Sequence, residues 1–214
     1  DAIAATFYDP DDNPIWNADV TWDWPALADG TGLGFTTEPF TDDTFVAGSG
    51  SVDLWVGSSS GDTDLEVTVT EVRPDGTEIY VQSGWLRASQ RALDARASSE
   101  LRPVQTHLEA DAAPLDDGEL TLARVEVFPF AHPFRAGSRL RLTVDAPGGN
   151  RPLWAFDTTI SDGETVTVGH GGGTPSRLVL AVVPGVDVPD PAPAACGALR
   201  GQPCRTWVAA ANGG

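Results

Sequence analysis

Apolar and polar residues alternate along much of this chain, and this period of two is the feature that most restricts its fold. The alternation is clear at residues 51–56, 65–70, 79–81, 139–144 and 165–168. Successive side chains of a β-strand point to opposite faces, so each of these segments has one apolar face. The pattern predicts strands that bury one face each.

The four residues Arg73-Pro74-Asp75-Gly76 separate two of these strands. Proline presets the backbone angle φ for a turn, and glycine accepts the positive φ that tight turns require. We therefore expect a β-hairpin over residues 64–82.

Turn residues recur every 8 to 12 positions over much of the chain, and strands do not alternate with helices. This spacing is typical of an all-β sandwich or jelly roll. The uninterrupted apolar run at residues 178–183 predicts a strand with both faces buried in the core. Residues 86–102, rich in Ala, Leu, Arg and Gln, are the best candidate for a short helix.

The net charge of −18 comes from 13 basic residues, all arginine, and 31 acidic residues. Such a chain repels phosphate backbones and anionic membranes, so we expect neither nucleic acid nor a membrane as a partner. No signal peptide is visible. Since the chain begins at Asp1 and lacks methionine, we interpret it as a processed protein or an excised fragment.

Two motifs resemble parts of an α/β-hydrolase active site, but neither predicts catalysis here. Residues 57–61 read Gly-Ser-Ser-Ser-Gly and centre on Ser59, yet a strand follows where the nucleophile turn requires a helix. Residues 170–173 read His-Gly-Gly-Gly, but in that fold the oxyanion motif precedes the nucleophile. We interpret it as a glycine-rich hairpin loop, and we interpret His107 and His132 as packed or loop residues. No catalytic residue is expected.

No metal or other cofactor is expected, although a structural calcium ion is an alternative. Its candidate ligands are Asp9, Asp11 and Asp12, beside Asn13, which lack the spacing of an EF-hand loop. Weaker candidates are Asp62 with Asp64 and Asp116 with Asp117.

Three tryptophans near the start, Trp16, Trp22 and Trp24, leave a second function open. Exposed aromatic rings stack on sugars in carbohydrate-binding β-sandwich modules. We favour packing of these rings, because large aromatic side chains are mostly buried.

The only cysteines, Cys196 and Cys204, lie close together in a loop-like stretch. This arrangement predicts a local disulfide and an oxidising compartment, hence a secreted or extracytoplasmic protein. The enclosed loop is short, so the bond should contribute about 2.6 kcal/mol. We expect it to pin the tail and to do little for the core.

Six pieces of the sequence, in one consistent order, resemble the C-terminal domain of X-prolyl dipeptidyl-peptidases and cocaine-esterase-like hydrolases. They are residues 35–40 (FTTEPF), 52–58 (VDLWVGS), 62–65 (DTDL) with 72–76 (VRPDG), 84–87 (GWLR) with Arg91, 134–141 (FRAGSRLR) and 175–180 (PSRLVL). Ser138 stands where that family often has histidine.

The resemblance implies a jelly-roll β-sandwich of the galactose-binding-domain-like kind that packs on the α/β-hydrolase catalytic domain of the same parent protein. The catalytic Ser, Asp and His of such a protein lie in that other domain. The resemblance assigns structural roles to the motif residues Asp62, Asp64, Pro74, Gly76, Gly84, Arg87, Gly137, Arg139, Arg141 and Ser176.

These inferences divide the chain into three parts: an N-terminal strap over residues 1–32, the sandwich over 33–184, and a Pro-rich tether with a disulfide-bearing tail over 185–214. Arg139 and Arg141 alternate with Leu140 and Leu142, so we expect both arginines on an exposed strand face, where they reach carboxylates on neighbouring strands or on the partner domain. There each would contribute only about 0–1 kcal/mol. The predicted function is that of a non-catalytic accessory domain of a serine hydrolase of the X-Pro dipeptidyl-peptidase, esterase or acylase class.

Overall fold

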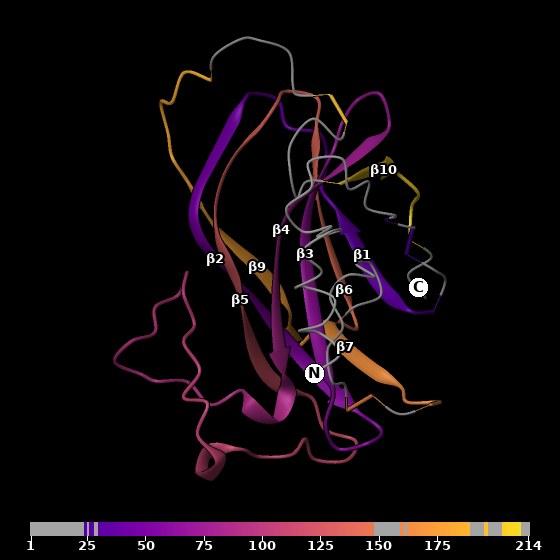
Figure 1. Ribbon diagram of the computed structural model, residues 1–214, viewed down its shortest axis with the longest axis vertical. Coiled ribbons are helices and arrows are strands. Elements are labelled where there is room, and N and C mark those ends of the chain that lie inside the picture. Colours follow the sequence, from indigo (N-terminus) through magenta and orange to yellow (C-terminus); the bar gives the residue numbers. More distant parts are fainter. Residues whose placement is uncertain are drawn as a thin grey trace, which may run out of the picture.

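The computed structural model packs two five-stranded antiparallel sheets face to face (Figure 1). It describes residues 24, 26–27, 30–147, 159–160, 162–188, 195–196 and 203–210. Sheet A has the order β1 (Gly32–Thr36), β6 (Arg139–Asp145), β3 (Asp64–Val72), β4 (Thr77–Arg87) and β10 (Cys204–Thr206).

Sheet B is built around the long strand β2 (Thr44–Ser58), with β5 (Thr121–Phe134) along one edge. The other edge of β2 pairs first with β9 (Arg177–Val182) and then with β7 (Val166–Gly171), which continues into β8 (Thr174–Pro175). Two short 3-10 helices, η1 (Ala88–Gln90) and η2 (Glu109–Asp111), lie in the connection between β4 and β5. The predicted all-β sandwich is confirmed.

The core lies between the sheets and consists of the apolar residues of the alternating pattern. Each strand contributes every second residue, because only one face of each sheet points inward. The inward residues include Val52, Leu54 and Val56 of β2, Leu65, Val67 and Val69 of β3, Ala123, Val125 and Val127 of β5, and Leu140, Leu142 and Val144 of β6. Each buried Val or Leu contributes about 1.5–3 kcal/mol.

The predicted hairpin is confirmed, since β3 and β4 pair antiparallel from Asp64–Arg87 to Val72–Glu78. Gly76 has a φ of 83° in the connecting turn. The backbone N–H of Arg73 donates to the carbonyl of Thr77 at 2.8 Å and closes the turn.

The helix expected over residues 86–102 is wrong. Strand β4 continues to Arg87, and only the short η1 follows it. Asp94 accepts hydrogen bonds from the backbone N–H groups of Arg96 and Ala97 with its side chain, and the Arg91 guanidinium donates to the carbonyls of Ala113 and Pro114. The hydrogen bonds of Asp94 satisfy backbone groups without a helix, and those of Arg91 tie this segment to residues 113 and 114.

The two-sided burial expected for residues 178–183 is also wrong. Among the strands of the described residues, β9 pairs with β2 alone and therefore lies at an edge. Leu178 and Leu180 pack against the core, whereas Val182 is 58% exposed and Val183 is 38% exposed. An apolar run does not show by itself whether its strand lies at the centre or the edge of a sheet.

Candidate functional site

The Gly-Ser-Ser-Ser-Gly motif lies at the end of β2 and in the turn that leads to β3, so strand follows strand as the sequence predicted. Ser59 Oγ accepts a hydrogen bond from the backbone N–H of Thr165 at 3.0 Å. The Ser58 hydroxyl donates to Glu164 Oε1 at 2.9 Å. Within the described part of the chain neither hydroxyl has a histidine partner, and both fasten the β2 end to the segment before β7.

The His-Gly-Gly-Gly motif forms the hairpin between β7 and β8, where His170 pairs with Pro175 and Gly172 has a φ of 59°. The interpretation as a glycine-rich hairpin is confirmed. The His170 ring lies 6.3 Å from that of Phe35 across the open side of the sandwich.

His132 lies on β5 and its Nε2 is 3.0 Å from Glu71 Oε2 on β3, so this pair joins the two sheets. Burial by itself would raise the pKa of Glu71, but the hydrogen bond from His132 and the nearby charge of Arg73 oppose it, and the pKa lies below its ordinary value. The interpretation of His132 as a packed residue is confirmed.

The group does not form a catalytic triad. A triad needs a nucleophile hydroxyl that is bonded to the histidine, whereas the Ser138 hydroxyl has no hydrogen-bond partner among the described residues. Ser138 is moreover only 1% exposed. His107, an exposed residue with a φ of 50°, lies in the loop between β4 and β5.

The predicted calcium ligands Asp9, Asp11 and Asp12 lie outside the described residues. Among the residues that the structure does describe, no group of His, Cys, Asp and Glu side chains is arranged to hold a metal ion.

Trp16 and Trp22 also lie outside the described residues, whereas Trp24 is only 5% exposed. The Arg205 guanidinium covers one face of its ring, with Cζ 3.9 Å from the ring centroid. Packing is therefore confirmed for Trp24, and its ring has no free face on which a sugar could stack.

Three motif residues tie β3 to β4 at the start of the hairpin. Arg87 makes a bidentate ion pair with Asp64, at 2.7 and 3.1 Å, and the backbone N–H of Thr159 donates to the same carboxylate. Burial would raise the pKa of Asp64, but these partners hold it below its ordinary value. Asp62 Oδ1 accepts from the backbone N–H groups of Thr63 and Ser89.

Gly84 permits a close approach between the two sheets. A Cβ at this position of β4 would lie 1.7 Å from the backbone carbonyl oxygen of Glu126 on β5. No side chain fits there, so Gly84 lets a strand of sheet A approach a strand of sheet B.

Two further motif residues, Gly137 and Ser176, form a turn and a link between strands. Gly137, with a φ of 85°, forms the turn before β6, and a Cβ on it would lie 3.2 Å from Pro74 of the hairpin turn. The Ser176 hydroxyl accepts from the backbone N–H of Trp55 and donates to the carbonyl of Gly169, which fastens β9 beside β2 and β7.

The two strand arginines differ: Arg141 reaches a carboxylate as expected, but the exposed position expected for it is wrong. Arg139 is 35% exposed and donates to the carbonyl of Thr37, as expected for a surface residue. The Arg141 side chain is only 2% exposed and lies 3.0 Å from Glu78, which is fully buried. The outer face of sheet A carries further buried polar residues, including Glu66, Thr68 and Thr143.

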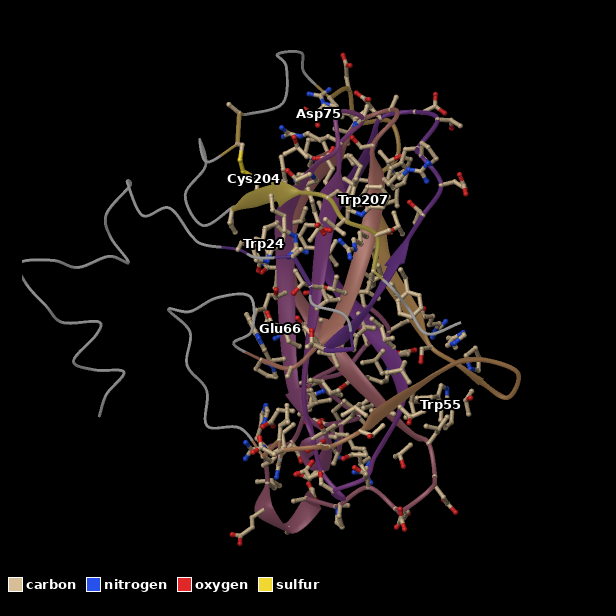
Figure 2. All side chains as sticks on the ribbon, turned by 90° about the vertical axis from the view of Figure 1, so that its right-hand side faces the viewer. Trp24, Trp55, Glu66, Asp75, Cys204 and Trp207 are labelled. Carbon is tan, nitrogen blue, oxygen red and sulfur yellow. A yellow bond between two sulfur atoms is a disulfide. The ribbon has the colours of Figure 1, made fainter. Side chains whose placement is uncertain are left out.

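Residues of the tail cover part of this outer face, and this explains the buried arginine. Figure 2 shows Trp24, Glu66 and Cys204 on the side of the sandwich opposite Trp55. The structure joins Cys196 and Cys204 in a disulfide, and Arg205 places its Nε 2.7 Å from Glu78. Sequence reasoning missed this ionic cluster, although a charged residue in each of β4, β6 and β10 was the available signal.

A mainly apolar groove of about 380 Å³ opens between the edges of the two sheets. Phe35, Val168, His170 and Leu178 lie along it. Its lining includes Ser176 and His170, but the Ser176 hydroxyl donates to the carbonyl of Gly169 and accepts from the backbone N–H of Trp55.

Comparison with known proteins identifies the family. The family model of the X-Pro dipeptidyl-peptidase C-terminal non-catalytic domain matches residues 3–179. Candidate serine esterases of Mycobacterium bovis and Mycobacterium tuberculosis are each 30% identical over 114 residues, which is 52% of this chain and 18% of each esterase.

Solved structures show the same fold within larger proteins. A CocE/NonD family hydrolase from Staphylococcus aureus superposes with a TM-score of 0.61 and 25% identity, over 71% of this chain and 30% of the hydrolase. An alpha-amino acid ester hydrolase superposes with a TM-score of 0.55 over 76% of this chain and 27% of its own, but its 21% identity shows the fold alone.

The chain thus spans 18% of the length of its curated relatives and 27–30% of these solved chains. The family match covers strands β1 to β8 and the first part of β9, and the superpositions agree with it. This chain belongs to the family of X-Pro dipeptidyl-peptidase C-terminal non-catalytic domains.

Proposed function

We propose that this chain is the C-terminal accessory domain of an α/β-hydrolase-type serine hydrolase, of the X-Pro dipeptidyl-peptidase, esterase or acylase class. The observation that carries the proposal is the family match over residues 3–179. The S. aureus hydrolase supports it, because the shared fold makes up only 30% of that chain.

In this proposal the catalytic serine belongs to the α/β-hydrolase domain of the same polypeptide, and the sandwich packs on that domain and shapes its active site. The geometry at Ser58, Ser59 and His132 supports this division of roles, since these side chains have structural partners. A carbohydrate-binding role gains no support from Trp24, whose ring is covered by Arg205.

The proposed parent is secreted or extracytoplasmic. The disulfide between Cys196 and Cys204 supports this, because such bonds persist in oxidising compartments. Among the described residues, no helix has the length and apolar character needed to cross a membrane.

We also propose a division into the sandwich, residues 33–184, and two flanking segments, 1–32 and 185–214. The described parts of both flanks contact sheet A: Trp24 packs against Tyr80 of β4, and β10 pairs with β4.

The test compares the full polypeptide of the same gene with this chain alone. A fluorophosphonate probe should label a serine of the full polypeptide and leave this chain unlabelled. Deletion of residues 33–214 from the full polypeptide should lower kcat/KM for ester or Xaa-Pro substrates at least tenfold. A parent without a labelled serine, or a deletion without effect, would contradict the proposed role.

A further inference from the structure

The last described residues of the chain, 203–210, include strand β10 of sheet A. Strand β10 pairs with β4, and the backbone N–H of Tyr80 donates to the carbonyl of Pro203 at 3.0 Å. The N–H of Trp207 donates to the carbonyl of Gly76 at 2.8 Å. Ala210 lies at the opposite edge of the sheet, where a Cβ on Gly34 of β1 would be 2.9 Å from its own Cβ. The tail therefore reaches from one edge of sheet A to the other.

Arg205 is the centre of this tail and contacts two distant parts of the chain. Its Nε lies 2.7 Å from Glu78 Oε2, and its guanidinium stacks on the ring of Trp24 with Cζ 3.9 Å from the centroid. Trp24 packs edge-on against Tyr80 at 6.3 Å between centroids. A guanidinium over an indole face is a favourable cation–π contact, strengthened where water is excluded. Arg205 thus fastens Trp24 to the sheet.

The position of Arg205 depends on the residue beside it. Cys204 is the first residue of β10 and forms the disulfide with Cys196, with 5.7 Å between the Cα atoms. Strand β10 is only three residues long and forms the edge of its sheet. Such a short edge pairing is weak alone, so the covalent bond restrains the tail that carries Arg205.

We propose that the Cys196–Cys204 disulfide and Arg205 form a redox-dependent clasp that holds Trp24 on the outer face of sheet A. A dithiol reductant opens the clasp. It transfers two electrons and two protons to the S–S bond, which becomes the thiols of Cys196 and Cys204, and is itself oxidised to a disulfide. The released tail then moves away from Glu78, and Trp24 loses its cover.

The consequence for the parent protein rests on the function proposed above. There the catalytic domain precedes the sandwich, so the segment around Trp24 lies between the two domains. The clasp then couples the redox state of the tail to the attachment of the catalytic domain.

Hydroxyl-radical footprinting of the full 214-residue chain tests the clasp, because Trp24 is 5% exposed and Phe134 of the core is 0% exposed. The oxidised protein is compared with protein that has been reduced with dithiothreitol, alkylated and freed of reductant. Mass spectrometry should show oxidation of Trp24 rising at least threefold, with Phe134 unchanged. Equal protection of Trp24 in both states, or a joint rise at Trp24 and Phe134, would overturn a local clasp.

Two variants separate Arg205 from the disulfide. In oxidised Arg205→Ala, Trp24 should lose its protection although the disulfide is intact. The matched control Arg135→Ala removes an arginine that pairs with Asp43 and should leave Trp24 protected. If Trp24 stayed protected in Arg205→Ala, the role of Arg205 would be refuted. Serine labelling of the parent tests the proposed function separately, since the footprint needs only this chain.

Discussion

Two arginines on the same strand have environments that their sequence neighbours do not distinguish. Arg139 and Arg141 occupy equivalent positions of β6, two residues apart, yet one lies at the surface and the other is buried against Glu78. Removal of one partner from a buried ion pair leaves an uncompensated charge, whereas a surface pair contributes little. The structure therefore predicts unequal effects of equal substitutions.

Arg141→Ala should lower the free energy of unfolding by about 3 kcal/mol. This is the lower end of the range for a broken buried pair, because Glu78 keeps Arg205 as a partner. Arg139→Ala is the matched control and should cost less than about 1 kcal/mol. Urea denaturation followed by fluorescence measures both, and equal midpoints for the two variants would argue against the buried cluster.

Glu71 should make the stability depend on acid pH. Its pKa in the folded protein lies below the ordinary glutamate value of 4.5, so the folded state favours the charged form. The contribution is therefore present above the unfolded pKa and is lost as the pH falls through the folded pKa. Glu71→Gln should show a flatter fall in stability below about pH 5 than the unsubstituted protein.

The control for this measurement is Glu38→Gln, since the Glu38 side chain is 95% exposed. The free energy of unfolding, measured by denaturant titration from pH 3 to pH 7, should keep its pH dependence in that variant. An identical acid slope in Glu71→Gln and the unsubstituted protein would show that the pair with His132 contributes nothing.

Strands β4 and β5 belong to different sheets and yet approach each other closely at Gly84. The approach brings Trp85 of β4 and Phe128 of β5 together at 5.5 Å between ring centroids. The absence of a side chain at one position therefore determines how two elements meet along their edges.

Gly84→Ala should destabilise the domain by at least about 3 kcal/mol, the upper part of the range for overpacking. The added Cβ would meet the backbone oxygen of Glu126, which cannot rotate away as a side chain would. Gly171→Ala in β7 is the control, because a Cβ there meets nothing within 4 Å. Thermal unfolding distinguishes the two, and a Gly84→Ala midpoint within 2 °C of the control would disprove the close approach.

The whole molecule is a sandwich whose two outer faces differ, as Figure 2 shows. The outer face of sheet A buries polar and charged residues beneath the tail, whereas sheet B carries Trp55 on its own outer side. Cys204 and Arg205 belong to sheet A, so the tail adds a strand and an ion pair to the sandwich. The sequence predicted only that the disulfide pins the tail.

At this scale we predict that the isolated chain will not hydrolyse activated esters or Xaa-Pro anilides above background. The hydroxyls of Ser58 and Ser59 bond to Glu164 and the Thr165 backbone, and neither pairs with a histidine among the described residues. Burst kinetics and fluorophosphonate labelling provide the assay, with the unfolded chain as the blank. A burst, or a label on Ser59, would refute the prediction.

The sequence by itself determined the two-sheet architecture, the hairpin at residues 64–82 and the inward set of Val and Leu residues. It could do so because alternation shows which side chains share a face, and Pro74 with Gly76 specifies a local turn. The motifs around Asp64, Arg87 and Ser176 likewise sufficed to indicate the family.

Only the tertiary structure decided which faces are covered. The burial of Arg141, the edge position of β9, and the place of Arg205 between Glu78 and Trp24 depend on segments far apart in the sequence. The alternation of apolar and polar residues along a strand is the same whether its outer face meets solvent or is covered by another part of the chain. The close approach at Gly84 has the same origin, because the carbonyl that excludes a side chain belongs to a strand 42 positions later.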